Sequence, residues 1–345
     1  MIVGLMVFFT KMMQHVMPSF KQRFDVFFSI KSGIEYAFLA NLIASIVVFL
    51  LVLPDILKIK FSIDKDLLQT ALRYSWPLAF ITLAASFNSY YTTPLVKFMS
   101  GGGSKGEEAA GIFSAGLKLS LLLNLFSTAY NYAAEPFFFN NAQKSENKQV
   151  FGQAALAFTI FSCMAAVGIY AYIDIVKELL GKGVQHGVIV MPLLLMANVF
   201  LGLYYNVSMW YKLSDNTRTG LLISLMGMVI TYAACYLLIP KVGIMGAAWA
   251  TFLCYLAMLI TSYFQGQKYY PLYYPLKKII TYLSLTSVIL FTFWMMREYL
   301  VIGLGTRIIF NTLIFIVGLY LIYMTELKIY LPKIKSLISS KLRAN

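Results

Sequence analysis

The hydrophobic pattern of the chain is a series of long apolar blocks separated by short polar segments. Each block approaches the roughly 20 residues that an α-helix needs to cross a hydrocarbon layer. The blocks lack the alternation of apolar and polar residues that a membrane β-barrel strand requires. The sequence therefore predicts an all-α fold, a polytopic membrane helical bundle with about ten transmembrane helices. The predicted spans are residues 1–20, 34–53, 76–96, 111–140, 150–173, 187–211, 220–239, 243–263, 279–296 and 308–325.

Composition supports the membrane interpretation. Of the 345 residues, 60% are apolar and 12% are charged, whereas a soluble domain carries roughly 25% charged residues. The polar segments between the blocks are short, and none is long enough to fold as a separate soluble domain. The polar surface is too small to cover a water-soluble core of this size.

Recognisable catalytic and cofactor motifs are missing from the sequence. His15 and His186 stand alone, and Cys163, Cys235 and Cys254 fall inside apolar blocks without CxxC spacing, so no metal site is indicated. Neither a GxxxxGK[ST] phosphate loop nor a dinucleotide-binding GxGxxG pattern occurs. We therefore expect no catalytic residue, no metal and no cofactor, and a protein that is not an enzyme.

The net charge of +14 follows membrane topology. The basic residues lie mainly between the apolar blocks and form no nucleic-acid-binding motif, so no nucleic acid partner is expected. When the loops are numbered alternately, one set holds sixteen basic residues and the other holds nine. By the positive-inside rule the richer set faces the cytoplasm, which with ten spans places both termini there. Five of the sixteen basic residues lie in the C-terminal tail, which therefore supplies much of the excess on that side.

Two ionisable residues fall inside one apolar block, residues 111–140. Charged side chains are costly at membrane depth and are therefore functional candidates. Lys118 either lines a cavity that accepts an anionic headgroup or extends its ammonium to the nearby interface. Glu135 is a coupling carboxylate, a partner of a basic loop residue or an interfacial cap.

A polar stretch precedes Pro94 inside the block 76–96. Asn88, Tyr90 and Tyr91 in this stretch suit either a hydrophilic lumen for sugars or hydrogen bonding between helices. Tyr130 suits either stacking on a sugar ring or packing between helices. The sequence leaves both alternatives open.

Four segments resemble a known family of membrane exporters. They are residues 236–251, residues 73–78, residues 111–118 with Pro136 closing that span, and residues 267–271. In the first, a helix ends at Ile239 and a four-residue turn leads to small residues that let the next helix pack closely. In their order and spacing these segments resemble the polysaccharide biosynthesis or O-antigen flippase family of the multidrug/oligosaccharidyl-lipid/polysaccharide (MATE-like) exporter superfamily.

The resemblance implies a domain organisation. Members have two six-helix bundles around a central cavity, often with two extra C-terminal helices. This chain then looks N-terminally shortened, a MATE-like exporter fold lacking about four N-terminal helices. Residues 1–66 would be a remnant of the first bundle with about two spans and a cytoplasmic connector, and residues 67–265 the second six-helix bundle. Residues 266–345 would hold two extra C-terminal helices and a basic cytoplasmic tail.

The resemblance also implies a function. It predicts a multi-pass protein of the cell inner membrane that translocates a polyprenyl-pyrophosphate-linked oligosaccharide by alternating access, for lipopolysaccharide, O-antigen or capsule biosynthesis. Its partners would be this lipid-linked oligosaccharide, membrane lipids and the glycan polymerase and ligase. Lys118, Arg73 and Arg218 would attract the pyrophosphate, and the polar and aromatic side chains named above would face the sugars.

Three alternatives stay open at the sequence level. One is a cation-coupled drug or metabolite exporter of the same superfamily, for which Glu135 is the deep carboxylate. Another is a membrane enzyme of glycan assembly, such as a polymerase. The third is an inactive fragment.

Overall fold

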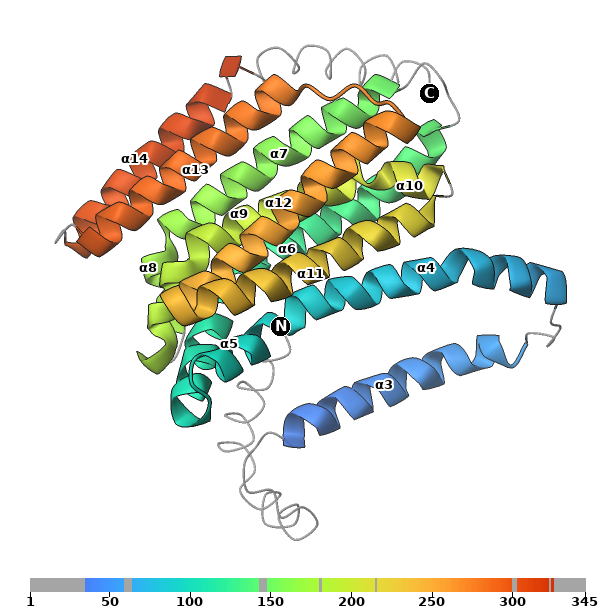
Figure 1. The fold of residues 1–345 in the computed structure, drawn as a ribbon, viewed down its shortest axis with the longest axis horizontal. Coiled ribbons are helices and arrows are strands. Elements are labelled where there is room, and N and C mark those ends of the chain that lie inside the picture. The colour runs from blue at the N-terminus through green and yellow to red at the C-terminus, as the bar shows by residue number, and fades with distance from the viewer. Residues whose placement is uncertain are drawn as a thin grey trace, which may run out of the picture. The chain divides into compact units, whose positions relative to one another are not determined.

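The computed structural model describes residues 35–58, 64–142, 148–179, 182–214, 216–299, 303–322 and 324–325. Throughout these ranges the regular elements are helices, joined by short turns (Figure 1). The predicted all-α fold is confirmed. The span expected at residues 1–20 lies outside the described residues.

Within the described ranges, seven stretches are long and apolar enough to cross a membrane. Each corresponds to one of the spans predicted from residue 111 onward, which supports a multi-pass membrane protein. Their principal helices are α6 (Gly103–Ala142), α7 (Lys148–Ala171), α9 (Met191–Val207), α11 (Thr217–Val242), α12 (Ile244–Tyr269), α13 (Leu276–Tyr299) and α14 (Leu304–Ile322). Shorter elements flank α9: α8 (Ile173–Val176), η2 (Lys177–Leu179) and η3 (Lys182–Val190) precede it, and α10 (Met209–Leu213) follows it.

Two other predicted spans are also helical but less uniformly apolar. The span at residues 34–53 is α3 (Glu35–Ile56), whose apolar part runs over Asn41–Ile56. The span at residues 76–96 is divided between α4 (Lys65–Tyr90) and α5 (Thr92–Met99), which meet at a bend. Polar residues near that bend and charged residues in the first turns of α4 account for its lower hydropathy.

The chain divides into two compact units, Met1–Leu68 and Gln69–Asn345. Helix α3 belongs to the first unit, and α4 begins in the first and continues into the second. The second unit contains every described helix from α5 onward and carries the features considered below. The domain boundaries predicted from the resemblance stay predictions.

Helix α9 forms the centre of the second unit. It packs against α6, α7, α12 and α13, and 78% of the residues in the most apolar window of its span are buried, against 6% for α14. Next to it, the indole Nε1 of Trp210 in α10 donates a hydrogen bond to the carbonyl oxygen of Ser262 in α12, at 3.1 Å. The unit is therefore organised around α9, with α14 at its periphery.

The turn between α11 and α12 is tighter than the sequence suggested. Helix α11 continues through Pro240, and the turn is made by Gly243, whose φ of 58° is in the region that favours glycine. Pro240 removes one N–H donor, but it lies in the last turn of α11 and its fixed φ is compatible with a helix. The expected close packing is confirmed, because a Cβ on Gly246 would lie 2.6 Å from the Leu238 carbonyl oxygen. Ala247 and Ala250 are fully buried at this contact.

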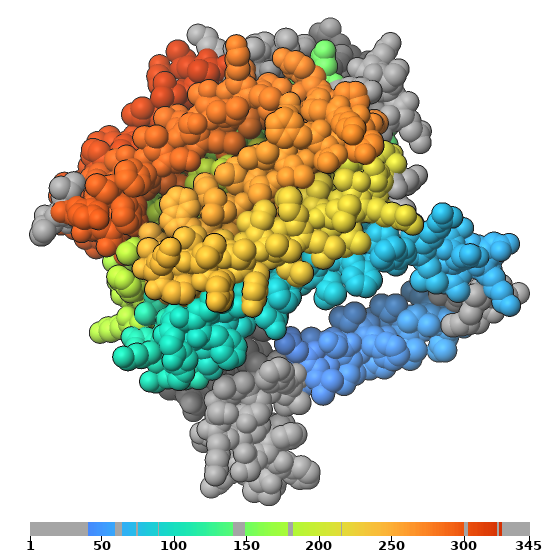
Figure 2. Space-filling view, in the orientation of Figure 1, coloured from blue at the N-terminus to red at the C-terminus, as the bar shows by residue number. Residues whose placement is uncertain are grey.

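The outer surface of the second unit is rich in large apolar side chains. Leu222 and Val229 of α11, and Trp249 and Phe264 of α12, are all more than 40% exposed. Figure 2 shows the yellow and orange side chains of α11 and α12 covering one face of this unit. A surface of this kind suits contact with lipid tails and would be poorly compatible with water.

We expect Gly246→Ala to destabilise the second unit by about 2 kcal/mol, because the added methyl group collides with the Leu238 backbone. Thermal unfolding of the purified protein in detergent measures the effect. Gly305→Ala is the matched control, since no heavy atom lies within 4 Å of a Cβ at that position. Equal unfolding temperatures for the two variants would contradict the close helix contact.

Candidate functional site

One face of α6 carries an exposed lysine in the middle of an apolar span. Lys118, Leu122, Leu125 and Tyr132 follow one another at helical spacing and are all exposed. Among the described residues Lys118 forms no ion pair or side-chain hydrogen bond. It lies ten residues after Glu108, about 15 Å along the helix at 1.5 Å per residue, and therefore inside the apolar block that begins at residue 111.

An ammonium group at this depth is costly if lipid surrounds it. Insertion of a lysine at the centre of a membrane helix costs about 3 kcal/mol. The alternative is that this face of α6 borders a hydrated cavity, where the ammonium stays solvated. The exposure of Lys118 fits both alternatives, and its role in a cavity stays a prediction.

The two other predicted cations lie on separate helices. Arg73 is exposed in α4, and Arg218 is exposed in the first turn of α11. No contact among the described residues joins either of them to Lys118. The proposed shared role in attracting a pyrophosphate stays a prediction.

The polar stretch at the end of α4 contains exposed and buried groups. Tyr90 and Tyr91 are 76% and 49% exposed, and the Tyr91 ring stacks on Phe87 at 4.0 Å between centroids. Asn88 is only 4% exposed, and neither its side-chain oxygen nor its side-chain nitrogen has a hydrogen-bond partner in the described part of the chain. Of the three residues predicted to face a sugar in this stretch, the two tyrosines are accessible and Asn88 is not.

Tyr130 is engaged within the bundle. Its hydroxyl oxygen lies 2.9 Å from Asn206 Oδ1 and 3.3 Å from the Ala154 carbonyl oxygen. Its ring packs against Phe158 at 4.8 Å between centroids. Sugar binding by Tyr130 would require it to exchange these contacts, and that role stays a prediction.

Glu135 forms an ion pair with a residue outside its own helix. The Lys212 ammonium nitrogen in α10 lies 2.6 Å from Glu135 Oε1, and the Glu135 side chain is 43% exposed. This pairing is one of the three roles that the sequence left open. Because the Lys212 ammonium neutralises the Glu135 carboxylate, this pairing does not favour a role for Glu135 in coupling transport to an ion.

An apolar groove of about 560 Å³ lies between α7, α13 and α14. Val167 of α7, Leu285 of α13 and Phe315 of α14 line its interior, and Lys277 and Lys278 border one end. Helices α13 and α14 both pack against α7 (Figure 1). The groove offers an apolar channel with two ammonium groups at its mouth.

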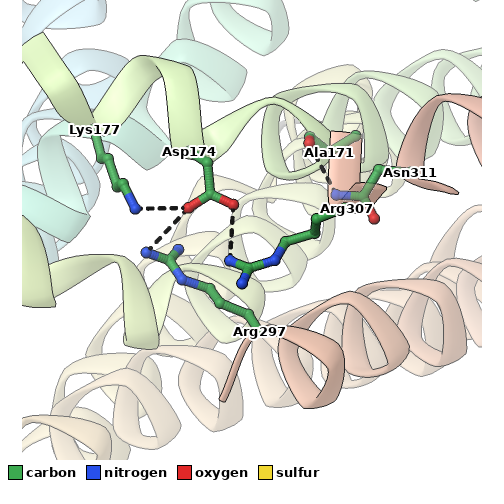
Figure 3. A network of polar contacts seen from close by, with 6 residues as sticks. All are labelled: Ala171, Asp174, Lys177, Arg297, Arg307 and Asn311. Carbon is green, nitrogen blue, oxygen red and sulfur yellow. Dashed lines mark hydrogen bonds and ion pairs between the residues drawn. The ribbon is translucent and has the colours of Figure 1, made fainter. Parts of the chain in front are cut away.

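A cluster of charged side chains connects the ends of α7, α13 and α14 opposite the two lysines (Figure 3). Asp174 Oδ1 lies 2.8 Å from Lys177 Nζ and 3.5 Å from Arg297 Nη2, and Asp174 Oδ2 lies 3.1 Å from Arg307 Nη1. Asn311 adds a hydrogen bond from its Nδ2 to the Ala171 carbonyl oxygen at 3.0 Å. We call Asp174, Lys177, Arg297 and Arg307 the Asp174 cluster.

Burial of Asp174 would by itself raise its pKa. The hydrogen bond from Lys177 and the positive charges of Arg297, Lys177 and Arg307 act in the opposite direction and prevail, so the pKa of Asp174 lies below its ordinary value. The carboxylate is therefore ionised at neutral pH and stabilises the attachment of α13 and α14 to α7.

Sequence reasoning missed the Asp174 cluster. Asp174 follows immediately after the apolar block that ends at residue 173, and its three basic partners were counted only as loop charges. Arg297 and Arg307 flank the turn between two consecutive spans, with Asp174 and Lys177 one helical turn apart elsewhere in the chain. The position of these four charged residues at the ends of predicted spans was the sequence signal that could have indicated the cluster.

Comparisons with known proteins support the fold. No family model matches the sequence, and no match is found among curated proteins. Among solved structures, the chain is similar to lipid II flippase MurJ in its inward closed conformation, with a TM-score of 0.60 and 17% sequence identity. The alignment covers 86% of this chain and 64% of the flippase chain. A likeness at this identity shows that the chain has an all-helical membrane fold like that of the flippase.

We expect Asp174→Asn to destabilise the protein by about 2 kcal/mol, because three partly buried cations lose their shared carboxylate. The measurement is thermal unfolding in detergent at neutral pH. Glu107→Gln is the control, since the pair of Glu107 with Lys97 at 2.8 Å is exposed and a small change is expected there.

This stabilisation should depend on pH. Because the pKa of Asp174 is lowered in the folded protein, its contribution is complete above the ordinary value of 3.8 and is lost as the pH falls through the lower folded value. The difference in stability between the wild type and Asp174→Asn should therefore shrink below about pH 3.8. A difference that is unchanged at pH 3 would argue against an ionised Asp174.

Proposed function

We propose that this chain is a flippase that moves a polyprenyl-pyrophosphate-linked oligosaccharide from the cytoplasmic to the outer leaflet by alternating access. The observation that carries the proposal is Lys118, an unpartnered cation among the described residues, exposed within the apolar span of α6. An anionic headgroup crossing hydrocarbon needs compensating charge along its path, and Lys118 lies where that charge is needed.

The exposed face of α6 offers a path for such a headgroup. It combines Lys118 with the hydroxyl groups of Thr128 and Tyr132, both exposed. Hydroxyl groups bind sugar hydroxyls, and an ammonium binds a phosphate oxygen through charge-assisted hydrogen bonds. In this proposal, the face is one wall of the translocation cavity.

The apolar groove supplies a place for the lipid tail. Its interior is lined mainly by apolar side chains of α7, α13 and α14, and its volume is within the range of small-molecule sites. By the positive-inside rule, Lys277 and Lys278 border its cytoplasmic end. A polyprenyl chain would occupy the groove while its headgroup enters the cavity beside α6.

The similarity to lipid II flippase MurJ supports the proposal at the level of fold. That protein is a flippase for a lipid-linked precursor, as its name says. We extend a related activity to this chain because the fold likeness coincides with a deep cation and an apolar groove. The resemblance in sequence favours a precursor of lipopolysaccharide O-antigen or capsule as the substrate, and the cell inner membrane as the location.

Lys118→Ala should reduce surface glycan display by about tenfold or more in cells that depend on this protein, because it removes a charge-assisted contact to the headgroup. Lipid-linked single units should accumulate in the cytoplasmic leaflet. Lys118→Arg should keep more activity than Lys118→Ala, because the charge is retained.

Lys241→Ala is the control for this experiment. Lys241 is exposed at the end of α11, so this substitution removes one positive charge at a position away from α6. The abundance of each variant in the membrane is measured in parallel. Normal display with Lys118→Ala at normal abundance would show that the headgroup role is wrong.

Gly318→Leu should weaken binding of a fluorescent polyprenyl phosphate by about fivefold, because the new side chain occupies groove volume otherwise available to one or two methylene groups. Gly305→Leu is the matched control. Both glycines belong to α14, and neither has a heavy atom within 4 Å of a built Cβ, so both variants should fold. Only Gly318 lines the groove, and equal binding by the two variants would exclude the groove as the tail site.

A further inference from the structure

An ion pair lies near the end of α6, on the same helix as Lys118. Glu135 follows the exposed Tyr132 by three residues, and residues at that spacing are neighbours on a helix surface. Glu135 Oε1 lies 2.6 Å from the ammonium nitrogen of Lys212 in α10. Lys118 and Glu135 are separated by about 25 Å along the helix at 1.5 Å per residue. One cation therefore lies inside the span, and another lies at its end.

This ion pair is accessible and lies beside breaks in two helices. The side chains of Lys212 and Glu135 are 26% and 43% exposed, so water and a ligand can reach both. Pro136, directly after Glu135, has no N–H to donate to the preceding turn of α6. Lys212 belongs to α10, a helix of five residues that Ser208 separates from α9. Since an exposed ion pair contributes little stability, Glu135 can be exchanged for another anion while the fold is kept.

The residue before Lys212 connects α10 to the start of α11. The Tyr211 ring packs against Gly220, where an added Cβ would lie 2.9 Å from Tyr211 Cε2. Arg218 lies two residues before Gly220 in the first turn of α11, and its side chain is exposed. This contact brings a second cation to the end of the bundle where Lys212 lies.

The other neighbour of α10 is the end of α12. The Trp210 ring stacks on the Tyr269 ring, with 5.7 Å between centroids. Lys268 directly precedes Tyr269, is exposed, and holds its ammonium nitrogen 5.6 Å from the Tyr269 ring centroid. Lys268 is therefore a third cation at this end of the bundle.

Acidic residues are few at this end. In the described part of the chain from α6 onward, Glu135 is the one acidic residue there. The others lie near the start of α6, directly after α7 and at the end of α13, which is the opposite end of the bundle. Asp215 lies outside the described residues. The described positive charges outnumber the negative ones at this end and favour an anionic ligand.

We propose that Lys212 is the first contact of the substrate pyrophosphate, which displaces Glu135 from the ammonium group at the cytoplasmic end of the path. This inference rests on the proposed function and assigns its entry step. By the positive-inside rule the three cations face the cytoplasm, the side from which the substrate starts. A pyrophosphate carries more charge and more acceptor oxygens than a carboxylate, so it competes with Glu135 for Lys212.

Glu135 also limits how tightly the entry site holds its ligand. The displaced carboxylate is exposed enough to stay hydrated. When the headgroup advances along α6 toward Lys118, the pair of Glu135 with Lys212 forms again. A transport path needs contacts that are strong enough for entry and weak enough for release. Competition by Glu135 meets the second requirement.

The test measures binding to the full chain in nanodiscs of phosphatidylcholine, with farnesyl pyrophosphate as the probe. Farnesol, which has the same apolar chain without phosphate, and inorganic pyrophosphate are the comparison ligands. We expect Lys212→Gln to weaken binding of farnesyl pyrophosphate by about tenfold and Lys212→Arg to weaken it less. Lys241→Gln, which removes an exposed cation at the other end of α11, should have no effect.

Glu135→Gln separates an exchangeable ion pair from a purely structural one. Removal of the competing carboxylate should tighten binding of farnesyl pyrophosphate by about threefold. In the Lys212→Gln background it should have no further effect, because Glu135 acts through Lys212. Glu107→Gln is the matched control, since it removes a carboxylate from an exposed pair with Lys97 at the start of α6.

Four results would overturn the proposal. They are unchanged binding with Lys212→Gln, unchanged or weaker binding with Glu135→Gln, tightening by Glu135→Gln that persists without Lys212, and inorganic pyrophosphate that binds as tightly as farnesyl pyrophosphate. Thermal unfolding in the same nanodiscs checks that each variant folds. If Lys212→Gln does not fold, Arg218→Gln takes its place, with an expected weakening of about threefold, and unchanged binding there counts against the proposal.

Repeating the titrations in the Lys118→Ala background distinguishes failure of the entry site from failure of the flippase proposal. The effects of the Lys212 and Glu135 variants should persist there, and their loss would show that they belong to the deeper cation. Normal glycan display with Lys118→Ala and persistent effects would reject the translocation path and keep the anion site. Lost display with Lys118→Ala and unchanged binding with Lys212→Gln would reject the entry site alone.

Discussion

In a hydrocarbon layer the backbone must satisfy its own hydrogen bonds, and the rest of this structure depends on that constraint. Each peptide group without a partner would cost several kcal/mol there, which leaves helices as the usable elements for a chain of apolar blocks. The helices then associate without a strong hydrophobic driving force, since lipid is as apolar as their side chains. Packing geometry and a few polar contacts must hold them together.

Both kinds of contact are present in the second unit. Gly243 supplies the positive φ with which α11 turns into α12, and Gly246 allows α12 to approach the Leu238 backbone closely. Polar contacts connect the peripheral helices, as where Tyr172 Oη and Thr312 Oγ1 lie 3.2 Å apart between the end of α7 and α14. Since only 6% of the apolar window of α14 is buried, such contacts at one end account for much of its attachment.

The charged residues at membrane depth fall into two classes once the structure is known. Asp174 and Glu135 each have a cationic partner on another helix, Arg307 at 3.1 Å and Lys212 at 2.6 Å respectively. Lys118 has none among the described residues and is exposed. Paired charges stabilise the bundle, whereas an unpaired charge needs water or a ligand. Lys118 is therefore the strongest candidate for contact with a transported anion.

The sequence alone determined the fold class and the positions of the seven spans from residue 111 onward, because blocks of about 20 apolar residues have one stable solution in a bilayer. It also singled out Lys118 and Glu135, because charges within such blocks are rare. The pairing of Glu135 with Lys212, the engagement of Tyr130 with Asn206 and the Asp174 cluster were decided by tertiary structure. Each joins residues between 76 and 133 positions apart. Helical periodicity describes which residues share a face of one helix, but it carries no information about which faces meet. Contacts between helices depend on crossing geometry and side-chain shape, and only the folded chain supplies these.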